Sequence, residues 1–396
     1  MATSTRPRQA AAPALLYAGI LLIAANLRAP ITGVAPLLNL IRPAFGLGTA
    51  AAGALTTLPL LAFAAVSPLG ARAARAFGLE RTLFAALAAI AAGIALRSAG
   101  TAACLYLGTA VIGMGIAVGN VLLPSLVKRD FPQRVAATTA AYALAMGLAA
   151  ALGSALAVPL AHAWGWRGAL GAFAVLPLAA LAVWAAQLGG HAMPARGAAS
   201  APHGGGALWR SALAWQITLF LGLNSTLYYA AVGWLPTILA DAGFSPARAG
   251  SLHGLLQLAT ALPGLVLGPL LARLRDQRAP AAAVAGLAAI ALLGLLAAPQ
   301  WAAVWAFMLG FGSGAAIILG LAFVSLRAAS AQQAAALSGM AQGIGYLLAA
   351  AGPSVVGAIH DGLGGWTVPL AGCAALAAGA AAMGWLAGRN RHIGGA

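Results

Sequence analysis

Acidic residues are scarce in this chain of 396 residues, which has five Asp and Glu against 21 Lys and Arg and a net charge of +16. Charged residues of both signs make up 7% of the sequence, whereas soluble proteins carry about a quarter. The five carboxylates, Glu80, Asp130, Asp241, Asp276 and Asp361, all fall in polar breaks between apolar runs. A proton relay built from acidic groups inside a membrane is therefore excluded.

Lysine and cysteine are also rare. The single lysine, Lys128, follows no glycine-rich loop, which excludes a phosphate-binding ATPase loop. Cys104 and Cys373 have neither metal-ligand spacing nor a disulfide framework. HExxH, CxxC and GxSxG motifs and paired catalytic carboxylates are missing, so we expect no enzyme, no metal site and no cofactor. The arginines are scattered between apolar segments, which argues against a nucleic-acid partner.

Apolar residues dominate instead, at 62% of the sequence with a mean hydropathy of +0.94. Apolar runs of about 18 to 25 residues recur, each long enough to cross a bilayer. They predict an all-α polytopic membrane protein with twelve transmembrane helices. The expected spans are residues 14–40, 50–70, 82–97, 102–127, 135–160, 167–187, 213–239, 249–271, 280–298, 301–326, 334–359 and 367–388.

The order of these runs predicts two bundles of six helices. Residues 1–13 form a tail, 14–187 the first bundle, 188–212 a Gly/Pro/Ser/Ala-rich linker, 213–388 the second bundle and 389–396 a second tail. Pro36 and Pro236, like Trp166 and Trp366, recur at an offset of roughly 200 residues, which indicates pseudo-symmetric halves. Arginines concentrate in the loops of one side, so both termini are expected to be cytoplasmic.

Arg28 lies near the middle of the first apolar run, within AANLRAPITGVAPLL (residues 24–38). A guanidinium at the centre of a membrane helix costs about 2.5 to 3.5 kcal/mol, so it usually faces a cavity, a partner or a substrate. Because no carboxylate lies inside a span, we expect the counter-charge to be an anionic or strongly electron-rich ligand. The alternative is that Arg28 extends its side chain to the outer interface.

Other polar side chains in the spans lie four residues apart, on single helix faces. The candidates for lining a central cavity are Asn26, Asn120, Asn224, Ser225, Tyr228, Tyr229, Trp234 and Gln342. For the amides, bonding between helices is the alternative. Gly310 with Gly314, and Gly339 with Gly343, predict close helix packing.

Proton coupling or gating has its own candidates, which are His253, Gln257, Ser338, Tyr346 and Asp276. His253 could take up and release a proton at physiological pH. The alternative is a structural histidine held by hydrogen bonds.

Three segments indicate a family. NLRAPITGVAPLL (26–38), NSTLYYAAVGWLPTIL (224–239) and ALSGMAQGIGYLLAAAGP (336–353) resemble the cyanate permease and 2-nitroimidazole transporter branch of the major facilitator superfamily. The resemblance implies alternating access around a central site in a bacterial-type inner membrane. It implies that Arg28 and Asn26 face Asn224, Tyr228 and Tyr229, with Asn120 nearby and with Gln342 and His253 closer to the interface that opens. The acidic residue usual after the second span is missing, which leaves Asp276 as the candidate for a gating ion pair.

We therefore expect secondary active or facilitative uptake of a small anion of the cyanate or carboxylate kind. Arg28 would anchor the charge, and the tyrosines and Trp234 would form the walls. Efflux of a neutral nitroheteroaromatic compound is the first alternative, and a non-transporting receptor or scaffold is the second. The expected partners are a small anionic substrate, the lipid bilayer and, as an open alternative, a co-transported proton, and we expect a monomer.

Overall fold

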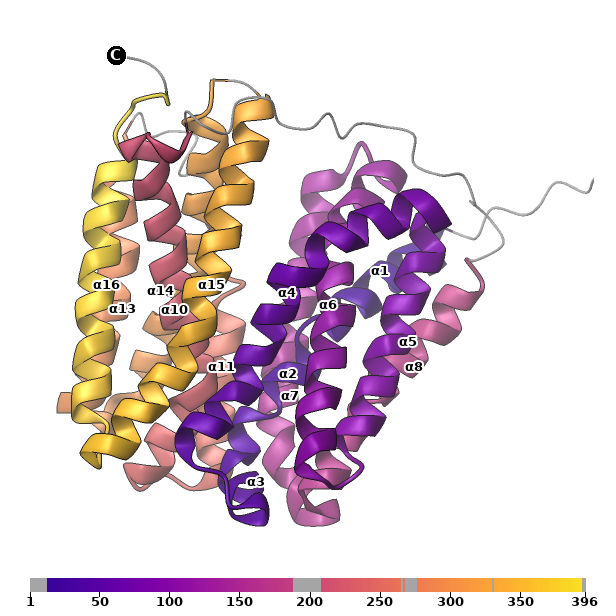
Figure 1. Cartoon of the computed structure of the whole chain (residues 1–396), viewed down its shortest axis with the longest axis vertical. Helices are drawn as coiled ribbons and strands as arrows, with labels where there is room; N and C mark the ends of the chain where they lie inside the picture. The colour runs from indigo at the N-terminus through magenta and orange to yellow at the C-terminus, as the bar shows by residue number, and fades with distance from the viewer. Residues whose placement is uncertain (1–12, 188–207, 265, 268–275, 330, 394–396) are drawn as a thin grey trace, which may run out of the picture.

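The computed structural model describes residues 13–187, 208–264, 266–267, 276–329 and 331–393, and every regular element in that part of the chain is a helix (Figure 1). The first half contains α1 (Pro13–Asn26), α2 (Ala29–Thr32), η1 (Ala35–Leu37), α3 (Leu38–Phe45), α4 (Thr49–Phe77), α5 (Leu79–Arg97), α6 (Ala102–Asp130), α7 (Val135–Ala172) and α8 (Val175–Ala185). The second contains α10 (Ala212–Asp241), α11 (Pro246–Ala259), α13 (Arg278–Ala297), η2 (Pro299–Trp301), α14 (Ala302–Leu326), α15 (Ala331–Leu363) and α16 (Thr367–Ala387).

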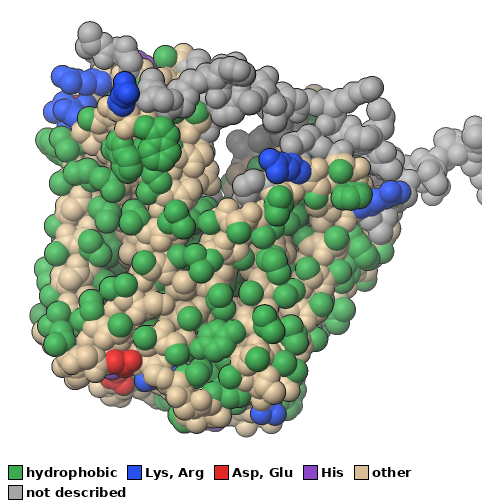
Figure 2. Space-filling model, viewed as in Figure 1, with side chains coloured by type: hydrophobic (Ala, Val, Ile, Leu, Met, Phe, Trp, Pro, Cys, Tyr) green, Lys and Arg blue, Asp and Glu red, His purple; other side chains and the backbone are tan. Residues whose placement is uncertain are grey.

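Nine of the described helical segments are long and apolar enough to cross a membrane. Large apolar side chains point outward from them, such as Leu107 and Leu347, which are each 60% exposed. Hydrophobic side chains cover the middle of the face in Figure 2, whereas Lys and Arg gather mainly near the end at which α16 finishes. The predicted all-α membrane class is confirmed, and the number of twelve spans stays a prediction. The predicted tail and linker fall largely on residues 1–12 and 188–207, outside the described part.

The first apolar run forms one candidate span, Ala14–Phe45, but the expectation that a continuous helix runs through Arg28 is wrong. Proline lacks an N–H, and its ring clashes with the carbonyl four residues earlier. Pro30 stands four residues after Asn26, where α1 ends, and Pro36 stands four residues after Thr32, where α2 ends. Arg28 therefore lies in the break between α1 and α2.

The helices form two groups, α1–α8 and α10–α16, which meet at one end and diverge toward the end at which α16 finishes (Figure 1). Several polar contacts join the groups where they meet, and two of them mark the two seams. Thr57 Oγ1 of α4 donates to the Ala350 carbonyl of α15 at 2.7 Å. Ser154 Oγ of α7 donates to the Gly250 carbonyl of α11 at 3.0 Å. The two seams, α4 with α15 and α7 with α11, close this end of the molecule.

A glycine interrupts α7 close to the predicted boundary between the fifth and sixth spans. Gly165 has a φ of 68°, in the left-handed region that favours glycine. Two helices therefore meet at a kink within α7.

Candidate functional site

A cavity of about 690 Å³ lies between the two groups of helices. Its walls come from α2, α4, α6, α10, α14 and α15 and from the break after α1. This volume falls within the range of about 300 to 1,000 Å³ that is common for small-molecule sites. The polar and aromatic residues of interest in its lining are Arg28, Asn120, Tyr228, Tyr229, Gln342 and Tyr346.

Arg28 crosses the cavity from the first group to the second. One guanidinium nitrogen donates to the Tyr228 hydroxyl, and the guanidinium carbon lies 5.4 Å from the centre of the Tyr228 ring. Within the described residues Arg28 makes no ion pair with a carboxylate. The break between the helices brings this charge to the cavity, and its remaining N–H groups are suited to an acceptor from outside the protein.

Aromatic rings surround the guanidinium. The rings of Tyr228 and Tyr229 lie 5.0 Å apart at 70°, and the ring of Tyr346 lies 6.1 Å from that of Phe63. Tyr228 donates its hydroxyl proton to Gln257 Oε1 at 2.7 Å. The cavity thus combines one cation, apolar ring faces and hydroxyl groups, which suits a small planar molecule with an oxygen-rich end.

His253 is fully buried in the seam between α7 and α11, away from the cavity lining. Its Nδ1 lies 2.7 Å from Ser154 Oγ, and its Nε2 lies 3.4 Å from Gln257 Nε2. Gln257 joins it to the Tyr228 hydroxyl. The structure therefore brings His253 and Gln257 together, as their spacing predicts, and it connects them to Arg28.

Three expected cavity residues are used inside the protein instead. Asn26 donates to the Leu22 carbonyl of its own helix at 2.8 Å. Asn224 donates to the Ser313 carbonyl of α14 at 3.1 Å. Trp234 is fully buried and its indole N–H donates to a carbonyl of α15 at 2.7 Å. For these residues the cavity expectation is corrected, and for Asn224 the alternative of bonding between helices describes the structure.

The other candidates are distributed along α10 and α15. Ser225 borders a smaller cavity of about 160 Å³ together with Arg28 and Tyr229. Ser338 Oγ accepts a hydrogen bond from Gln342 Nε2 at 2.7 Å, next to the main cavity.

The glycine pair of α15 does not pack as its spacing predicts. Gly339 and Gly343 both line the main cavity, and a Cβ on either would meet nothing within 4 Å. By contrast, a Cβ on Gly310 of α14 would come within 2.9 Å of Ala259 Cβ on α11. The prediction of close packing is thus wrong for the pair on α15, where the small residues widen the cavity.

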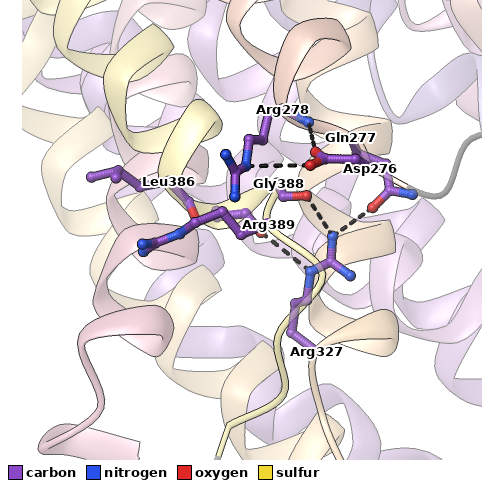
Figure 3. A network of polar contacts seen from close by, with 8 residues as sticks. Asp276, Gln277, Arg278, Arg327, Leu386, Gly388 and Arg389 are labelled. Carbon is purple, nitrogen blue, oxygen red and sulfur yellow. Dashed lines mark hydrogen bonds and ion pairs between the residues drawn. The ribbon is translucent and has the colours of Figure 1, made fainter.

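Asp276 belongs to a polar cluster at the end of the second group (Figure 3). Its carboxylate lies 3.3 Å from Arg278 Nε and accepts from the Arg278 backbone N–H at 2.8 Å. Arg327 donates to the carbonyls of Ala387 and Gly388 at 3.2 and 2.9 Å. Burial lowers the pKa of the Arg327 guanidinium, and the charge of Asp276 opposes that shift. Among the described residues this cluster joins α13, α14 and α16, so the contacts named above all lie within the second group.

Ser154 is a residue that the sequence interpretation missed. It faces His253 in one seam, while Ser354 lies 3.3 Å from Thr57 in the other. The two serines stand at the same repeat offset as Pro36 and Pro236. This repetition of a polar residue inside an apolar run could have identified Ser154 from the sequence.

The sequence model of the Major Facilitator Superfamily matches residues 17–350. The chain is 57% identical to the 2-nitroimidazole transporter of Escherichia coli (strain K12), over 96% of both proteins. It is 43% identical to the "uncharacterized transporter YycB" of Bacillus subtilis (strain 168), over 96% of this chain and 94% of that protein. It is 27% identical to the cyanate transport protein CynX of E. coli (strain K12), over 86% of this chain and 89% of that protein.

Proposed function

Because this chain belongs to the major facilitator superfamily, we propose that it moves a small planar anion across the inner membrane by alternating access, with Arg28 as the charge anchor. The observation that carries this proposal is the guanidinium of Arg28, which borders the cavity without a carboxylate partner among the described residues. A guanidinium presents parallel donors that match a carboxylate, and such charge-assisted bonds are about twice as strong as neutral ones.

The relatives are named as transporters, so the prediction that the chain is not an enzyme is confirmed. Beyond that class, the proposed architecture is twelve spans in two pseudo-symmetric bundles with cytoplasmic termini. Corresponding contacts in the two halves support it. Arg129 at the end of α6 pairs with Glu80 at 2.7 Å, and Arg327 at the end of α14 donates to Gln277. The hydrogen bonds to Asp130 and Glu80 raise the pKa of Arg129.

Alternating access has support in the asymmetry of the molecule. The seams of α4 with α15 and of α7 with α11 close one end, while the groups diverge toward the other (Figure 1). We assign the closed end to the outer side, which makes this an inward-facing conformation. Separation of the two seams would expose the cavity to the opposite solution.

A neutral nitroheteroaromatic compound is the second candidate substrate. Its specific support is the relative at 57% identity, which is named as a 2-nitroimidazole transporter. The rings of Tyr228, Tyr229 and Tyr346 around the cavity could stack on such a molecule. In that case ring contacts, rather than the charge of Arg28, would supply most of the affinity.

The test is uptake of labelled cyanate, benzoate and 2-nitroimidazole into proteoliposomes. For an anionic substrate, Arg28→Gln is expected to lower uptake by about 10- to 100-fold, since a hydrogen bond to a charged group contributes about 1.5 to 3 kcal/mol. Arg42→Gln is the matched control, because Arg42 lies outside the cavity lining and donates to the Leu47 carbonyl. Size-exclusion chromatography and thermal unfolding would verify that both variants fold.

The same assay separates the two candidates. Uptake of 2-nitroimidazole alone, indifferent to Arg28→Gln but abolished by Tyr228→Ala, would replace the anion proposal with the neutral one. Anion uptake that survives Arg28→Gln would remove the charge anchor from the proposal.

A further inference from the structure

A continuous hydrogen-bond chain leads from the cavity to the seam between α7 and α11. It consists of Arg28, Tyr228, Gln257, His253, Ser154 and the Gly250 carbonyl. Arg28 and Ser154 belong to the first group of helices and the other members to the second, so the chain crosses between the groups at both of its ends. We refer to it as the Arg28–Gly250 chain.

The donors at the cavity end all point toward the seam. The Tyr228 oxygen accepts from Arg28, and its proton goes to Gln257 Oε1 at 2.7 Å. The Gln257 amide therefore presents its N–H₂ group to His253 Nε2, at 3.4 Å. An amide N–H₂ only donates, so Nε2 is the unprotonated acceptor of the imidazole.

The seam end fixes the other imidazole nitrogen. Ser154 has one hydroxyl proton, and it goes to the Gly250 carbonyl at 3.0 Å. The serine oxygen must then accept from His253 Nδ1–H, which lies 2.7 Å away. His253 is thus neutral and protonated at Nδ1 in this conformation, with every donor of the chain directed away from the cavity.

An anion held by Arg28 would change the direction of the first donor. A charged acceptor is stronger than a neutral amide oxygen, so the Tyr228 hydroxyl would turn to the anion. The Tyr228 oxygen could then accept from Gln257 once the amide turns over. Gln257 Oε1 would face His253 Nε2, and that contact needs a proton on Nε2.

Two forms of His253 could supply that proton. A neutral Nε2–H tautomer would require Ser154 to donate to Nδ1 and to release the Gly250 carbonyl, which breaks the bond between α7 and α11. An imidazolium keeps the hydrogen bond from Nδ1–H to Ser154 and the hydrogen bond from Ser154 to the Gly250 carbonyl. It also donates a new hydrogen bond from Nε2–H to Gln257. The protonated form is therefore the one that satisfies the reversed chain while the seam remains closed.

We propose that His253 is a proton-binding site linked to the cavity, so that an anion held by Arg28 and Tyr228 and a proton on His253 bind together. The proposal rests on the proposed anion transport and names its coupling ion. The proton comes from solution, and the pair of a monovalent anion and a proton adds no net charge. His253 gains access to solvent when Ser154 moves away with α7, because the Ser154 contact covers Nδ1.

Within the described residues, few other ionisable groups surround His253. Its helix α11 packs on α7, α10, α14 and η1, and α14 and η1 carry no titratable side chain. The titratable groups of the others are Tyr142, His162 and Arg167 on α7 and Tyr228, Tyr229 and Asp241 on α10, with Arg248 on α11 itself. Of these only Tyr228 joins His253 through hydrogen bonds, by way of Gln257. A bound anion is thus the natural counter-charge.

The experiment measures proton uptake when benzoate is added to the purified full-length protein in weakly buffered detergent solution near pH 6.5. Wild type is expected to take up close to one proton per bound benzoate. The apparent dissociation constant of wild type for benzoate should rise by up to about tenfold for each unit by which the pH increases. His253→Gln, which cannot titrate in this range, should bind benzoate with little proton uptake and no pH dependence.

Two further variants show whether the chain carries the effect. Gln257→Met keeps His253 but interrupts its connection to Tyr228, so proton uptake should also be lost, even if His253→Gln fails to fold. His162→Gln removes an exposed histidine of α7 that is not a member of the Arg28–Gly250 chain, and this variant should behave as wild type. Benzoate binding without proton uptake, or uptake that persists in His253→Gln or Gln257→Met, would overturn the proton site and leave the anion proposal intact. Failure of benzoate and cyanate to bind at all would overturn both.

Discussion

Arg97 is a buried arginine that contacts the helix directly after Arg28. Its side chain is fully buried, and Nη1 donates to the Pro30 carbonyl at 2.6 Å. Its Nε and Nη2 have no hydrogen-bond partner within the described residues. Pro30 lies in α2, which starts directly after Arg28. A cation buried with so little compensation costs several kcal/mol. Because its hydrogen bond goes to the Pro30 carbonyl, we expect Arg97 to help position the break.

We expect Arg97→Met to stabilise the protein while weakening ligand binding. Removing the buried charge recovers several kcal/mol, whereas leaving the Pro30 carbonyl unpaired costs about 1 to 3 kcal/mol. The thermal unfolding temperature should therefore rise while benzoate affinity falls. Arg248→Met is the control, since that arginine is exposed and its removal should change stability by less than about 0.5 kcal/mol. A variant with lower stability and unchanged binding would show that Arg97 has a purely structural role.

Individual residues also mark the limit of what spacing can predict. Asn224 and Tyr228 stand four apart on α10, so the sequence could assign them to one face. The Asn224 amide reaches the Ser313 carbonyl of α14, while the longer Tyr228 side chain reaches Arg28. Which neighbour a side chain contacts depends on its length and on the packing of other helices. Helical spacing in the sequence gives information on neither of these.

At the scale of helices, the break after α1 depends on one proline. Pro30→Ala supplies an N–H four residues after Asn26, and alanine is more favourable than proline inside a helix by about 3 kcal/mol. We expect α1 to continue through Arg28, which turns the guanidinium away from Tyr228. Benzoate affinity should fall by about tenfold or more, the equivalent of one charge-assisted hydrogen bond, without loss of thermal stability.

The matched control for that prediction is Pro36→Ala. It changes the same residue type at the next break, after Thr32, but leaves the turn around Arg28 unaltered. Circular dichroism would follow the gain of helix, and isothermal titration with benzoate would follow binding. Equal affinities in both variants and in wild type would mean that the break does not determine where Arg28 points.

Most of the helices could be predicted from the sequence, because long apolar runs determine their number of turns and their approximate ends. An expectation based on hydropathy misses the break at Arg28, since hydropathy treats Pro30 and Pro36 as ordinary apolar residues. Their rigid rings act on the residue four positions earlier, and α1 and α2 end at Asn26 and Thr32.

At the scale of the molecule, the repeat in the sequence has a physical counterpart. Arg28 and Tyr228 are 200 residues apart and meet across the cavity. The repeat offset could predict that such positions are related, but not that the two groups touch at one end and diverge at the other. That difference depends on which conformation is lowest in free energy, and the contacts of the seams decide it.

Asp361, in the second group, caps the first turn of helix α4, in the first group. The long helix α4 starts after Gly48 with no side-chain cap of its own. The Asp361 carboxylate of α15 instead accepts the backbone N–H groups of Thr49 and Ala50, at 2.9 and 3.3 Å. These bonds exist only while α4 and α15 are together, so they favour the conformation that is closed at this end.

We expect Asp361→Ala to favour opening of that end by about 1 kcal/mol, or roughly fivefold, because that is the typical contribution of a helix cap. The measurement is the rate at which a thiol reagent modifies a cysteine placed at Ser354, which is half-buried beside Thr57 in the seam. Cys104 and Cys373 are first replaced by serine. Asp241→Ala is the control, since Asp241 accepts from Trp366 within one group. Equal modification rates in Asp361→Ala and in the control would mean that the cap does not hold this end closed, and that the apolar contacts between α4 and α15 suffice to do so.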